Sequence, residues 1–421
     1  MIGTAHFAGD MRPSSTAFQL PRLLYLSDVP PDSTPGNAAM YRLLQNYPSE
    51  RLRILLGNIQ SGTPEARLRG PRYDSLRTAR FPRLITTRFA SLYGACLYAT
   101  TPWKAGLAGK AIEEFRPQAI FTVAHTFGWL IADAVAQRYG LPLHLAVWDD
   151  HARQAGLPSW ARAWGERRFA DVYRRATSRL CISPNMAELF ERRYGVPGTV
   201  LYPPRAADLV VAKTPPPRLG NPTRQLVFGF AGSVNYGPYA AMLGTLARIL
   251  GERGHRFVVF GGLKPEVAHK HGIEGPHVVV HPMLPIEAVL ARIYEQVDVL
   301  FAPMAFDPEF KHDMHISFPS KLTDYTAVGL PLLIWGPPYS SAARWARENP
   351  GVAALVQQAD PAALGGAIDE LTSSPAQRLA MGQRALEVGN RMFDHAAVTG
   401  LLHSIIAASV SEPGASGDSN K

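Results

Sequence analysis

The sequence predicts an α/β protein with two doubly wound, Rossmann-like parallel-sheet domains that face each other across a cleft. Short apolar strands alternate with helical stretches in both halves of the chain, and a proline-rich segment separates the halves. At 421 residues the chain is also too long for one ordinary core, which favours two domains.

The first half of the chain shows the strand and helix spacing of βαβ units. Helices are expected from about residue 38 and from His125 to Arg138. Strands that are buried on both faces of a parallel sheet are apolar without alternation. By this criterion strands are expected at 22–30, 51–58, 118–124 and 141–151, and a further strand is expected from residue 178.

The second half repeats this architecture after the proline-rich segment. Residues 202–225 hold six prolines and little periodicity, which indicates an interdomain linker, placed at 206–225. Further strands are expected at 226–233, 255–262, 277–283, 297–304 and 330–336. The expected division is a flexible N-terminus at 1–20, domains at 21–205 and 226–390, a helix at 391–411 that returns to the first domain, and a disordered tail at 412–421.

The stretch "FPSKLTDYTAVGLPLLIWG" predicts a short helix followed by a buried strand. Pro319 suits the first turn of a helix, and Gly329 suits the left-handed position just past its end. One helix face would carry Ser320, Lys321 and Asp324. A helix N-terminus with a lysine suits a phosphate, and a carboxylate one turn deeper suits a pair of sugar hydroxyls. A solvated first turn with an i,i+3 ion pair is the alternative.

Several segments together resemble the GT-B-fold glycosyltransferases of family 4, which are retaining enzymes. The most specific is "PSKLTDYTAVGLP", and "VAHTFGWLIADAVA", "CISPNMAELFERRYGVPGTVLYPP" and "HPMLPIEAVLARIYEQVDVLFAPM" also fit. The similarity covers roughly residues 22–405. It implies transfer of a sugar from a nucleotide diphosphate sugar to a hydroxyl acceptor, with retention and without a metal. The first domain would then serve the acceptor, and the second would bind the donor.

The resemblance also implies roles for individual residues. Asp324 would hold the ribose hydroxyls, and Ser320 and Lys321 would face the diphosphate. His125 would contact the transferred sugar, although a histidine satisfied at a strand end is the alternative. The remaining residues expected at the nucleotide sugar are Gly36 and Asn37 in the first-domain loop, where an ordinary turn is the alternative, Gly232 and Ser233 at the phosphates, and Met283 and Leu284 at the nucleobase.

Two features depart from the family pattern. The position eight residues before Asp324, which commonly holds a carboxylate, is Ile316; the residues that could replace it are Glu309, Asp313 and His315. The segment after the first strand of the second domain lacks the usual Arg and Lys, which leaves Lys264 and Lys321 to neutralise the diphosphate. These departures keep open a catalytically weak nucleotide-sugar-binding or scaffold protein. A GT-B-fold sugar epimerase that uses the same nucleotide cleft is a further alternative.

Polar side chains also follow the expected strand at 141–151. Asp149, Asp150 and His151 would face the cleft, where an acceptor hydroxyl needs a proton acceptor. Asp149 and Asp150 are therefore catalytic candidates beside His125, with helix capping or a loop role as the alternative for at least one aspartate.

The net charge of +9 is concentrated between Arg51 and Arg116, where 12 Lys or Arg stand against 4 Asp or Glu. Arginines alternate there with aromatic and aliphatic residues, which suits an anionic membrane surface or an anionic acceptor. A solvated arginine-rich helix face is the alternative. The expected partners are a nucleotide-sugar donor, a carbohydrate or lipid-linked acceptor and an anionic membrane surface. No nucleic-acid-binding module is recognisable, so no nucleic acid is expected.

Cysteine usage and hydropathy indicate the compartment. Cys96 and Cys181 have no pairing or zinc-binding spacing, which favours a reducing environment. The sequence contains no stretch of about 20 apolar residues and no signal-like N-terminus. The expected location is the cytoplasm, with peripheral contact to the inner face of the membrane as a further option, in polysaccharide or glycolipid assembly.

Overall fold

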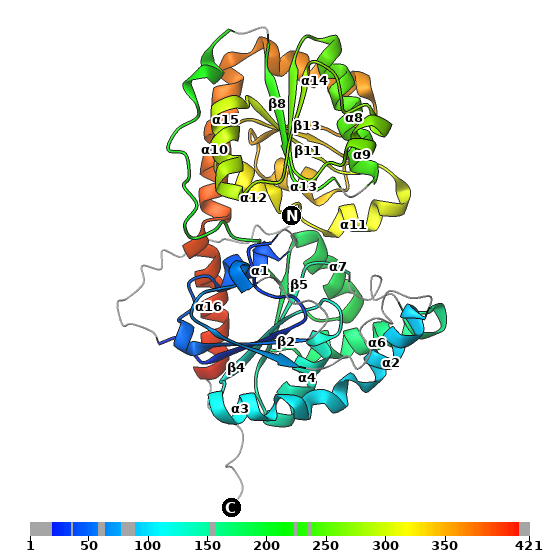
Figure 1. The fold of residues 1–421 in the computed structure, drawn as a ribbon, viewed down its shortest axis with the longest axis vertical. Helices are drawn as coiled ribbons and strands as arrows, with labels where there is room; N and C mark the ends of the chain where they lie inside the picture. Colours follow the sequence, from blue (N-terminus) through cyan, green and yellow to red (C-terminus); the bar gives the residue numbers. More distant parts are fainter. Residues whose placement is uncertain are drawn as a thin grey trace, which may run out of the picture.

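The structure of the chain is a computed structural model that describes seven stretches of the sequence. The described residues are 19–34, 37–57, 64–76, 89–150, 157–222, 225–234 and 237–411. Two α/β domains follow one another along the long axis of the molecule (Figure 1). Each contains one parallel sheet with helices on its faces, so the predicted fold class is confirmed.

The N-terminal domain is built on a seven-stranded sheet of order β3-β2-β1-β4-β5-β6-β7. Its central strands are buried along their whole length, which explains their unbroken apolar sequences. The strands are β1 (Leu23–Ser27), β2 (Leu52–Gly57), β3 (Arg72–Leu76), β4 (Ala119–Val123), β5 (Leu143–Val147), β6 (Ser178–Cys181) and β7 (Thr199–Val200). The helices are α1 (Ala38–Leu44), α2 (Ala90–Thr100), α3 (Gly109–Phe115), α4 (Gly128–Tyr139), α6 (Ser159–Arg175) and α7 (Pro184–Tyr194), with 3₁₀ turns η1 (Ser49–Arg51), η2 (Pro64–Ala66) and η4 (Thr101–Ala108).

The C-terminal domain is built on a six-stranded sheet of order β10-β9-β8-β11-β12-β13. Its strands are β8 (Val227–Ala231), β9 (Arg256–Phe260), β10 (Val278–His281), β11 (Val299–Pro303), β12 (Leu332–Trp335) and β13 (Ala353–Val356). Its helices are α8 (Gly237–Glu252), α9 (Pro265–His271), α10 (Ile286–Gln296), α11 (Lys311–Ile316), α12 (Lys321–Tyr325), α13 (Ser341–Glu348), α14 (Pro361–Ser373), α15 (Pro375–Met392) and α16 (His395–Ser411), with 3₁₀ turns η5 (Pro217–Gly220) and η6 (Pro308–Phe310).

The structure departs from the sequence expectations at particular elements. Strands β3 and β7 were not expected, because β3 is a polar edge strand and β7 has two residues. Helix α4 begins at Gly128 instead of His125, since Thr126 has a left-handed backbone with φ of +49°. Helix α12 ends at Tyr325, well before Gly329, so the helix dipole at Lys321 is that of little more than one turn.

The proline-rich segment is fastened to the C-terminal domain. The amide of Ala212 donates to the carbonyl of Ala327 at 2.8 Å. The buried Arg205 guanidinium donates to Thr323 O and Thr326 Oγ1, both at 3.1 Å, and to Asn390 Oδ1 at 2.6 Å. The segment therefore follows a fixed path beside α12 and α15.

Helices α15 and α16 run from one domain to the other (Figure 1). Together they form a stretch, Pro375–Val410, that is long enough to cross a membrane and contains an 18-residue window with a mean hydropathy of 1.2. In this fold Leu386 of α15 and Leu402 of α16 are buried in the cores of the two domains. His144 Nε2 of β5 lies 3.0 Å from Ser409 Oγ, which ties α16 to the N-terminal sheet. The stretch is therefore part of the globular fold.

Candidate functional site

The loops that follow the strands of the two sheets meet at the domain boundary. His312 Nε2, from the segment after β11, lies 2.8 Å from Asp150 Oδ2, which follows β5. Ser183 Oγ, which follows β6, donates to the carbonyl of Ile316. Because ligands of such sheets bind beyond the carboxyl ends of the strands, this boundary is the candidate site.

Lys321, whose side chain is half-buried, supplies a cation on the C-terminal side of the boundary. Its ammonium nitrogen lies 4.1 Å from the centre of the Phe230 ring and 5.5 Å from that of Tyr239. Desolvation by these surroundings lowers the pKa of Lys321 to about 7. Within the part of the chain that the structure describes, only aromatic faces contact this ammonium.

Glycine backbone lies next to Lys321. A methyl group on Gly232, whose φ is +142°, would lie 3.5 Å from Lys321 Nζ. A methyl group on Gly261 would lie 2.2 Å from the carbonyl oxygen of Gly232, and one on Gly262 would lie 3.4 Å from Met283 Cε. The structure thus brings the predicted Gly232, Lys321 and Met283 to one edge of the sheet, where the lack of a side chain on Gly232 and Gly261 permits close backbone packing.

Tyr325 fixes helix α12 to the carboxyl end of β8. Its hydroxyl accepts from the amide of Ala231 at 2.7 Å and donates to the carbonyl of the same residue at 3.1 Å. Lys321, one turn earlier on α12, is therefore positioned against the end of β8.

Asp324 does not present a free carboxylate in this structure. Arg42 of α1 donates from Nη1 to Asp324 Oδ1 at 2.9 Å and from Nη2 to Asp324 Oδ2 at 3.1 Å. The side chains are only 9% and 13% exposed. This bidentate pair crosses the domain boundary and occupies both oxygens that the sequence assigns to a ribose. Asp324 at a ribose stays a prediction that requires the pair to open.

His125 follows β4 on the N-terminal side, in a loop that Asp28 holds. Asp28 Oδ2 accepts from the amides of Phe127 at 2.8 Å and Gly128 at 2.7 Å, and from the Thr126 hydroxyl. Burial raises the pKa of Asp28, although these hydrogen bonds oppose the rise. Asp28 Oδ1 is buried without a hydrogen-bond partner. Asp28 therefore caps α4 and fixes the His125 loop, a role the sequence analysis missed.

Replacing Gly128 with alanine is expected to destabilise the protein through this loop. The new methyl carbon would lie 2.5 Å from the Asp28 nitrogen and 2.8 Å from the Ser27 carbonyl carbon, and both are backbone atoms that cannot move aside. We expect the free energy of unfolding to fall by about 1–3 kcal/mol, measured by urea unfolding. Gly237→Ala is the matched control, because no described residue has an atom within 4 Å of its methyl position. Equal stability of the two variants would contradict this account.

Asp150 lies in an ion-pair network that crosses the boundary. Besides His312, Arg193 Nη1 of α7 lies 2.9 Å from Asp150 Oδ2. Burial alone would raise the pKa of Asp150, but the hydrogen bonds and charges of His312 and Arg193 outweigh it and lower this pKa. A carboxylate that is held ionised by Arg193 and hydrogen-bonded to His312 is a poor proton acceptor, so the geometry favours a structural role over the predicted catalytic one.

Ile316 stands at the position where the family commonly has a carboxylate. Its side chain is fully buried. Of the proposed replacements, His315 Nδ1 lies 3.0 Å from the Tyr339 carbonyl oxygen, and Glu309 is exposed on η6. Asp313 acts electrostatically on Tyr239, whose ring faces Lys321. Asp313 is thus the replacement for which the structure gives a link to the Lys321 environment.

The other predicted residues are placed as follows. Ser233, Lys264 and Ser320 are exposed, and Leu284 is half-buried at the start of the segment before α10. Asn37 Nδ2 donates to Asp32 Oδ1 and Thr34 Oγ1, both at 3.2 Å, which anchors the first-domain loop. Asp149 is half-buried. Gly36 and His151 lie outside the described residues.

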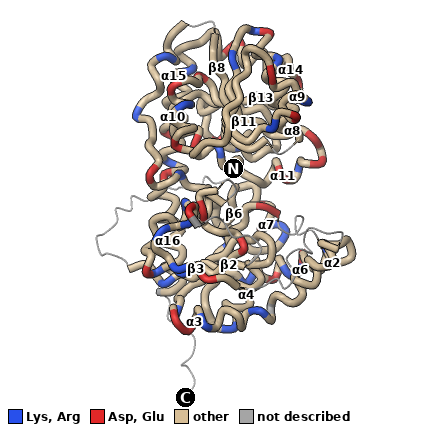
Figure 2. Tube along the Cα trace, in the orientation of Figure 1, with Lys and Arg blue, Asp and Glu red and all other residues tan. Residues whose placement is uncertain are grey.

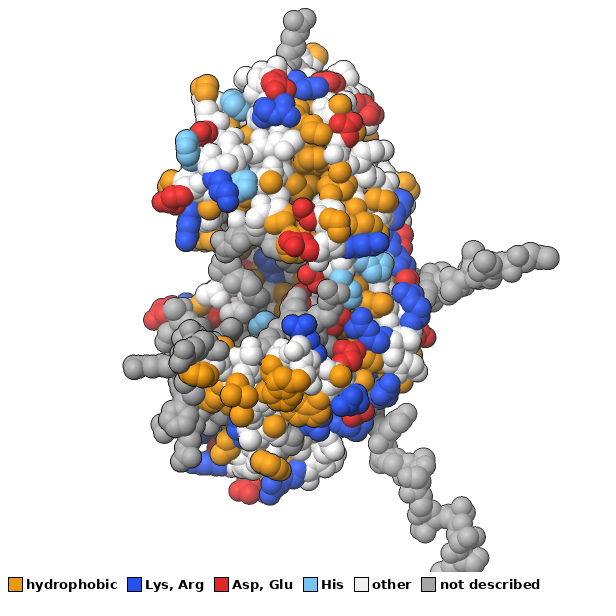
Figure 3. Space-filling view, turned by 90° about the vertical axis from the view of Figure 1, so that its right-hand side faces the viewer, with side chains coloured by type: hydrophobic (Ala, Val, Ile, Leu, Met, Phe, Trp, Pro, Cys, Tyr) orange, Lys and Arg blue, Asp and Glu red, His pale blue; other side chains and the backbone are white. Residues whose placement is uncertain are grey.

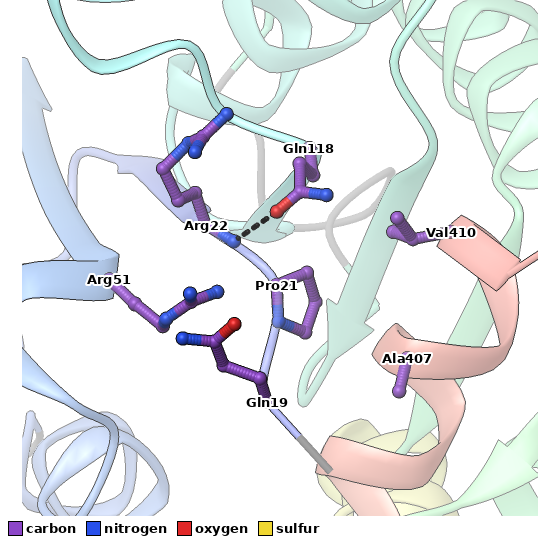
Figure 4. A pocket seen from close by; sticks show the side chains of 7 residues that line it. All are labelled: Gln19, Pro21, Arg22, Arg51, Gln118, Ala407 and Val410. Atoms are coloured by element: carbon purple, nitrogen blue, oxygen red, sulfur yellow. Dashed lines mark hydrogen bonds between the residues drawn. The ribbon is translucent and has the colours of Figure 1, made fainter.

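A separate cavity of about 290 Å³ lies at the amino ends of the central strands of the N-terminal sheet (Figure 4). Arg22 and Gln118, which precede β1 and β4, line it, and the amide of Arg22 donates to Gln118 Oε1 at 3.0 Å. The lining residues are Gln19, Pro21, Arg22, Arg51, Gln118, Ala407 and Val410. Because it lies at the amino ends of the strands, this cavity is not where a doubly wound sheet binds a nucleotide.

Comparison with known proteins supports the same fold and family. Residues 38–204 match the model of a glycosyl transferase 4-like domain family. The predicted resemblance to family 4 glycosyltransferases is thereby confirmed for residues 38–204. A search of curated proteins finds no match.

Solved structures match both domains together. HepE from Anabaena, in complex with UDP and glucose, has a TM-score of 0.65 at 12% identity over 92% of this chain and 100% of HepE. Sucrose-phosphate synthase from Thermosynechococcus elongatus has a TM-score of 0.63 at 14% identity, over 93% and 100% of the two chains. WaaG, a glycosyltransferase involved in lipopolysaccharide biosynthesis, has a TM-score of 0.59 at 13% identity, over 91% and 99%. At these identities the likeness establishes the GT-B fold.

Proposed function

We propose that the chain transfers a sugar from a nucleotide diphosphate sugar to a hydroxyl acceptor, with retention at the anomeric carbon. The reaction would serve polysaccharide or glycolipid assembly at the cytoplasmic side of a membrane. Fixed protein cations and backbone amides, without a metal ion, would stabilise the departing diphosphate.

The observation that carries the proposal is the desolvated Lys321 ammonium beside the Gly232 backbone. Burying a cation costs free energy unless an anion compensates it, and the contacts of this ammonium are aromatic. A diphosphate at this position would supply the missing negative charge. It would also lie beyond the end of β8, where a nucleotide is expected in such a sheet.

The donor base is proposed from the structural neighbours. HepE was solved with UDP, with UDP and glucose, and with UDP-glucose. UDP is therefore the first ligand to test, with a UDP-hexose as the proposed donor.

The test is isothermal titration of the full chain with UDP, GDP and ADP, followed by assays of sugar release from the matching nucleotide sugars. We expect binding of one nucleoside diphosphate and slow hydrolysis of its sugar ester when no acceptor is present. Failure of all three nucleotides to bind would overturn the proposal.

The lowered pKa of Lys321 predicts that donor binding depends on pH. Above pH 7 much of the free protein carries neutral Lys321, and a diphosphate raises this pKa again because it favours the charged form. Affinity for UDP-glucose should therefore be constant below about pH 7 and fall as the pH rises above it, with a proton taken up on binding. Titrations at pH 8 in two buffers of different ionisation enthalpy measure that proton.

Lys321→Arg is the control for this experiment, because a guanidinium stays charged at pH 8. The variant should bind without proton uptake. Equal heats in both buffers for the unmodified protein would contradict the assignment of Lys321 to the diphosphate.

A second candidate function is binding of a nucleotide sugar with little turnover. The buried Ile316, at the position where the family commonly has a carboxylate, favours it. Product analysis separates the possibilities: a new glycoside indicates transfer, bound donor without turnover indicates a binding protein, and an epimerised nucleotide sugar indicates the epimerase alternative.

A further inference from the structure

The cavity at the amino ends of the N-terminal sheet gathers polar side chains that the proposed reaction does not use. Arg22, Arg51 and Gln118 stand directly before strands β1, β2 and β4. The first residues of these strands are paired with one another, so the residues that precede them come together at one end of the sheet. With Gln19 and Pro21 they line a cavity of about 290 Å³ (Figure 4).

The two arginines of this cavity keep most of their hydrogen-bond donors. Arg22 Nε donates to the Arg116 carbonyl at 2.7 Å. Arg51 Nη1 donates to the Leu20 carbonyl at 2.6 Å. A guanidinium carries five N–H groups, and these two side chains make no other hydrogen bond or ion pair with a described residue. Several N–H groups on each arginine are therefore available to a ligand.

Neighbouring arginines of the N-terminal domain are instead paired with carboxylates. Arg53 pairs with Asp74 and Glu114. Arg72 contacts the same two carboxylates, so strand β3 carries charges of both signs (Figure 2). On the face that Figure 3 shows, Lys and Arg side chains of this domain are interspersed with Asp and Glu. The cavity differs, because no acidic side chain is among the described residues that line it.

The end of helix α16 completes the wall of the cavity. Ala407 and Val410 line it, and Ser409 Oγ between them lies 3.0 Å from His144 Nε2 of β5. This part of α16 is therefore held against the sheet. The cavity volume far exceeds the ~10–15 Å³ that a single water requires. It has room for an anion of several heavy atoms, which would contact both the sheet and α16.

We propose that this cavity binds a phosphate group, either as inorganic phosphate or as part of a small phosphorylated metabolite. A phosphate offers enough oxygens to meet both guanidiniums, whereas one bidentate arginine already fills the two oxygens of a carboxylate. Because Gln118 Oε1 accepts from the Arg22 amide, Gln118 Nε2 is the group of that side chain left to donate to the ligand. The proposal does not depend on sugar transfer.

Isothermal titration of the full chain tests the site with two probes, inorganic phosphate and glucose 6-phosphate, in a phosphate-free buffer. We expect a Kd of about 1 mM or tighter for at least one of them. Tighter binding of glucose 6-phosphate would assign the site to a phosphorylated metabolite, and tighter binding of phosphate would assign it to the free anion. Failure of both probes to bind would overturn the proposal.

Substitutions locate the binding. Arg22→Gln and Arg51→Gln should each weaken phosphate affinity by about tenfold or more, because each removes a charged donor. Arg72→Gln is the matched control, since it removes the same charge from an exposed side chain of the same domain, and it should bind normally. Lys321→Met should also keep phosphate binding, and Arg51→Gln should keep UDP binding. Loss of phosphate binding in Lys321→Met or in Arg72→Gln would overturn the assignment.

Amide hydrogen exchange locates the phosphate without a substitution. In the unmodified full chain, phosphate should slow exchange at residues 407–410 and at the Arg22 amide, because the ligand would hold the end of α16 to the sheet. Protection confined to α12 and the end of β8 would place the phosphate at the nucleotide site and overturn the proposal.

The residues that follow α16 are the competing occupant of the cavity. Residues 412–421 include the carboxylates of Glu412 and Asp418. A chain that ends at Ser411 tests them, and the proposal expects it to bind phosphate with the affinity of the full chain. Binding by the shortened chain alone would assign the arginines to these carboxylates and overturn the phosphate site.

Discussion

Replacing Lys321 with glutamate is expected to abolish binding of UDP and UDP-glucose. The substitution puts a carboxylate where a diphosphate would meet the Lys321 ammonium, so attraction becomes repulsion at the end of β8. Lys321→Met removes the charge alone, and should weaken binding by about 10- to 100-fold, the usual loss for a hydrogen-bonded charged group. Isothermal titration measures both effects.

The Lys321 experiment has two internal checks. Lys270→Glu, on the exposed face of α9, changes the net charge equally and should leave binding intact. Lys321→Met should not lower the thermal unfolding temperature, because it removes a charge whose desolvation already lowers its pKa. Full nucleotide affinity in Lys321→Met would show that the diphosphate binds elsewhere.

Replacing Arg42 with methionine is expected to tighten nucleotide binding. Methionine keeps the apolar stem that α1 buries, but it removes the guanidinium that occupies both oxygens of Asp324. If ribose hydroxyls bind Asp324, they compete with this ion pair, and its removal should raise UDP affinity by about five- to tenfold. Titration with UDP measures the change.

Two further variants make the Arg42 result specific. Arg344→Gln removes another boundary ion pair, with Glu188 at 2.7 Å, away from Asp324, and should leave UDP affinity nearly unchanged. In an Asp324→Ala background, which should itself weaken binding, Arg42→Met should have no further effect. Weaker binding in Arg42→Met alone would place Arg42 against the nucleotide instead of in competition with it.

Most of the fold could be predicted from the sequence because buried parallel strands leave a plain signal. Runs such as "LVFGFA" and "LPLLIW" are apolar without alternation and became β8 and β12. The edge strand β3, with the sequence "RYDSL", is mostly accessible and carries no such signal. The start of α4 was misplaced because the left-handed turn at Thr126 depends on Asp28, which is distant in sequence.

The candidate site was predictable only where its members are close in sequence. Ser320, Lys321 and Asp324 form one local pattern, and Gly232 follows a recognisable strand. The partners that change their chemistry come from far away: Arg42 lies 282 positions from Asp324, and His312 lies 162 positions from Asp150. No periodicity or motif connects such residues, so only the folded chain shows that Asp324 is paired and Asp150 is held ionised.

Ion pairs and hydrogen bonds cross the boundary between the domains, beside an apolar cluster that both domains share. Arg42 contacts Asp324 near α1, and Asp150, Ser183 and Arg344 make polar contacts near α7. Water and salt can replace such contacts, whereas they cannot replace a buried apolar interface. Meanwhile the linker and the α15–α16 pair cross the boundary as continuous chain. The linker and the α15–α16 pair therefore form a fixed connection between the domains. Ionic strength would change how far the two domains separate, without loosening either domain.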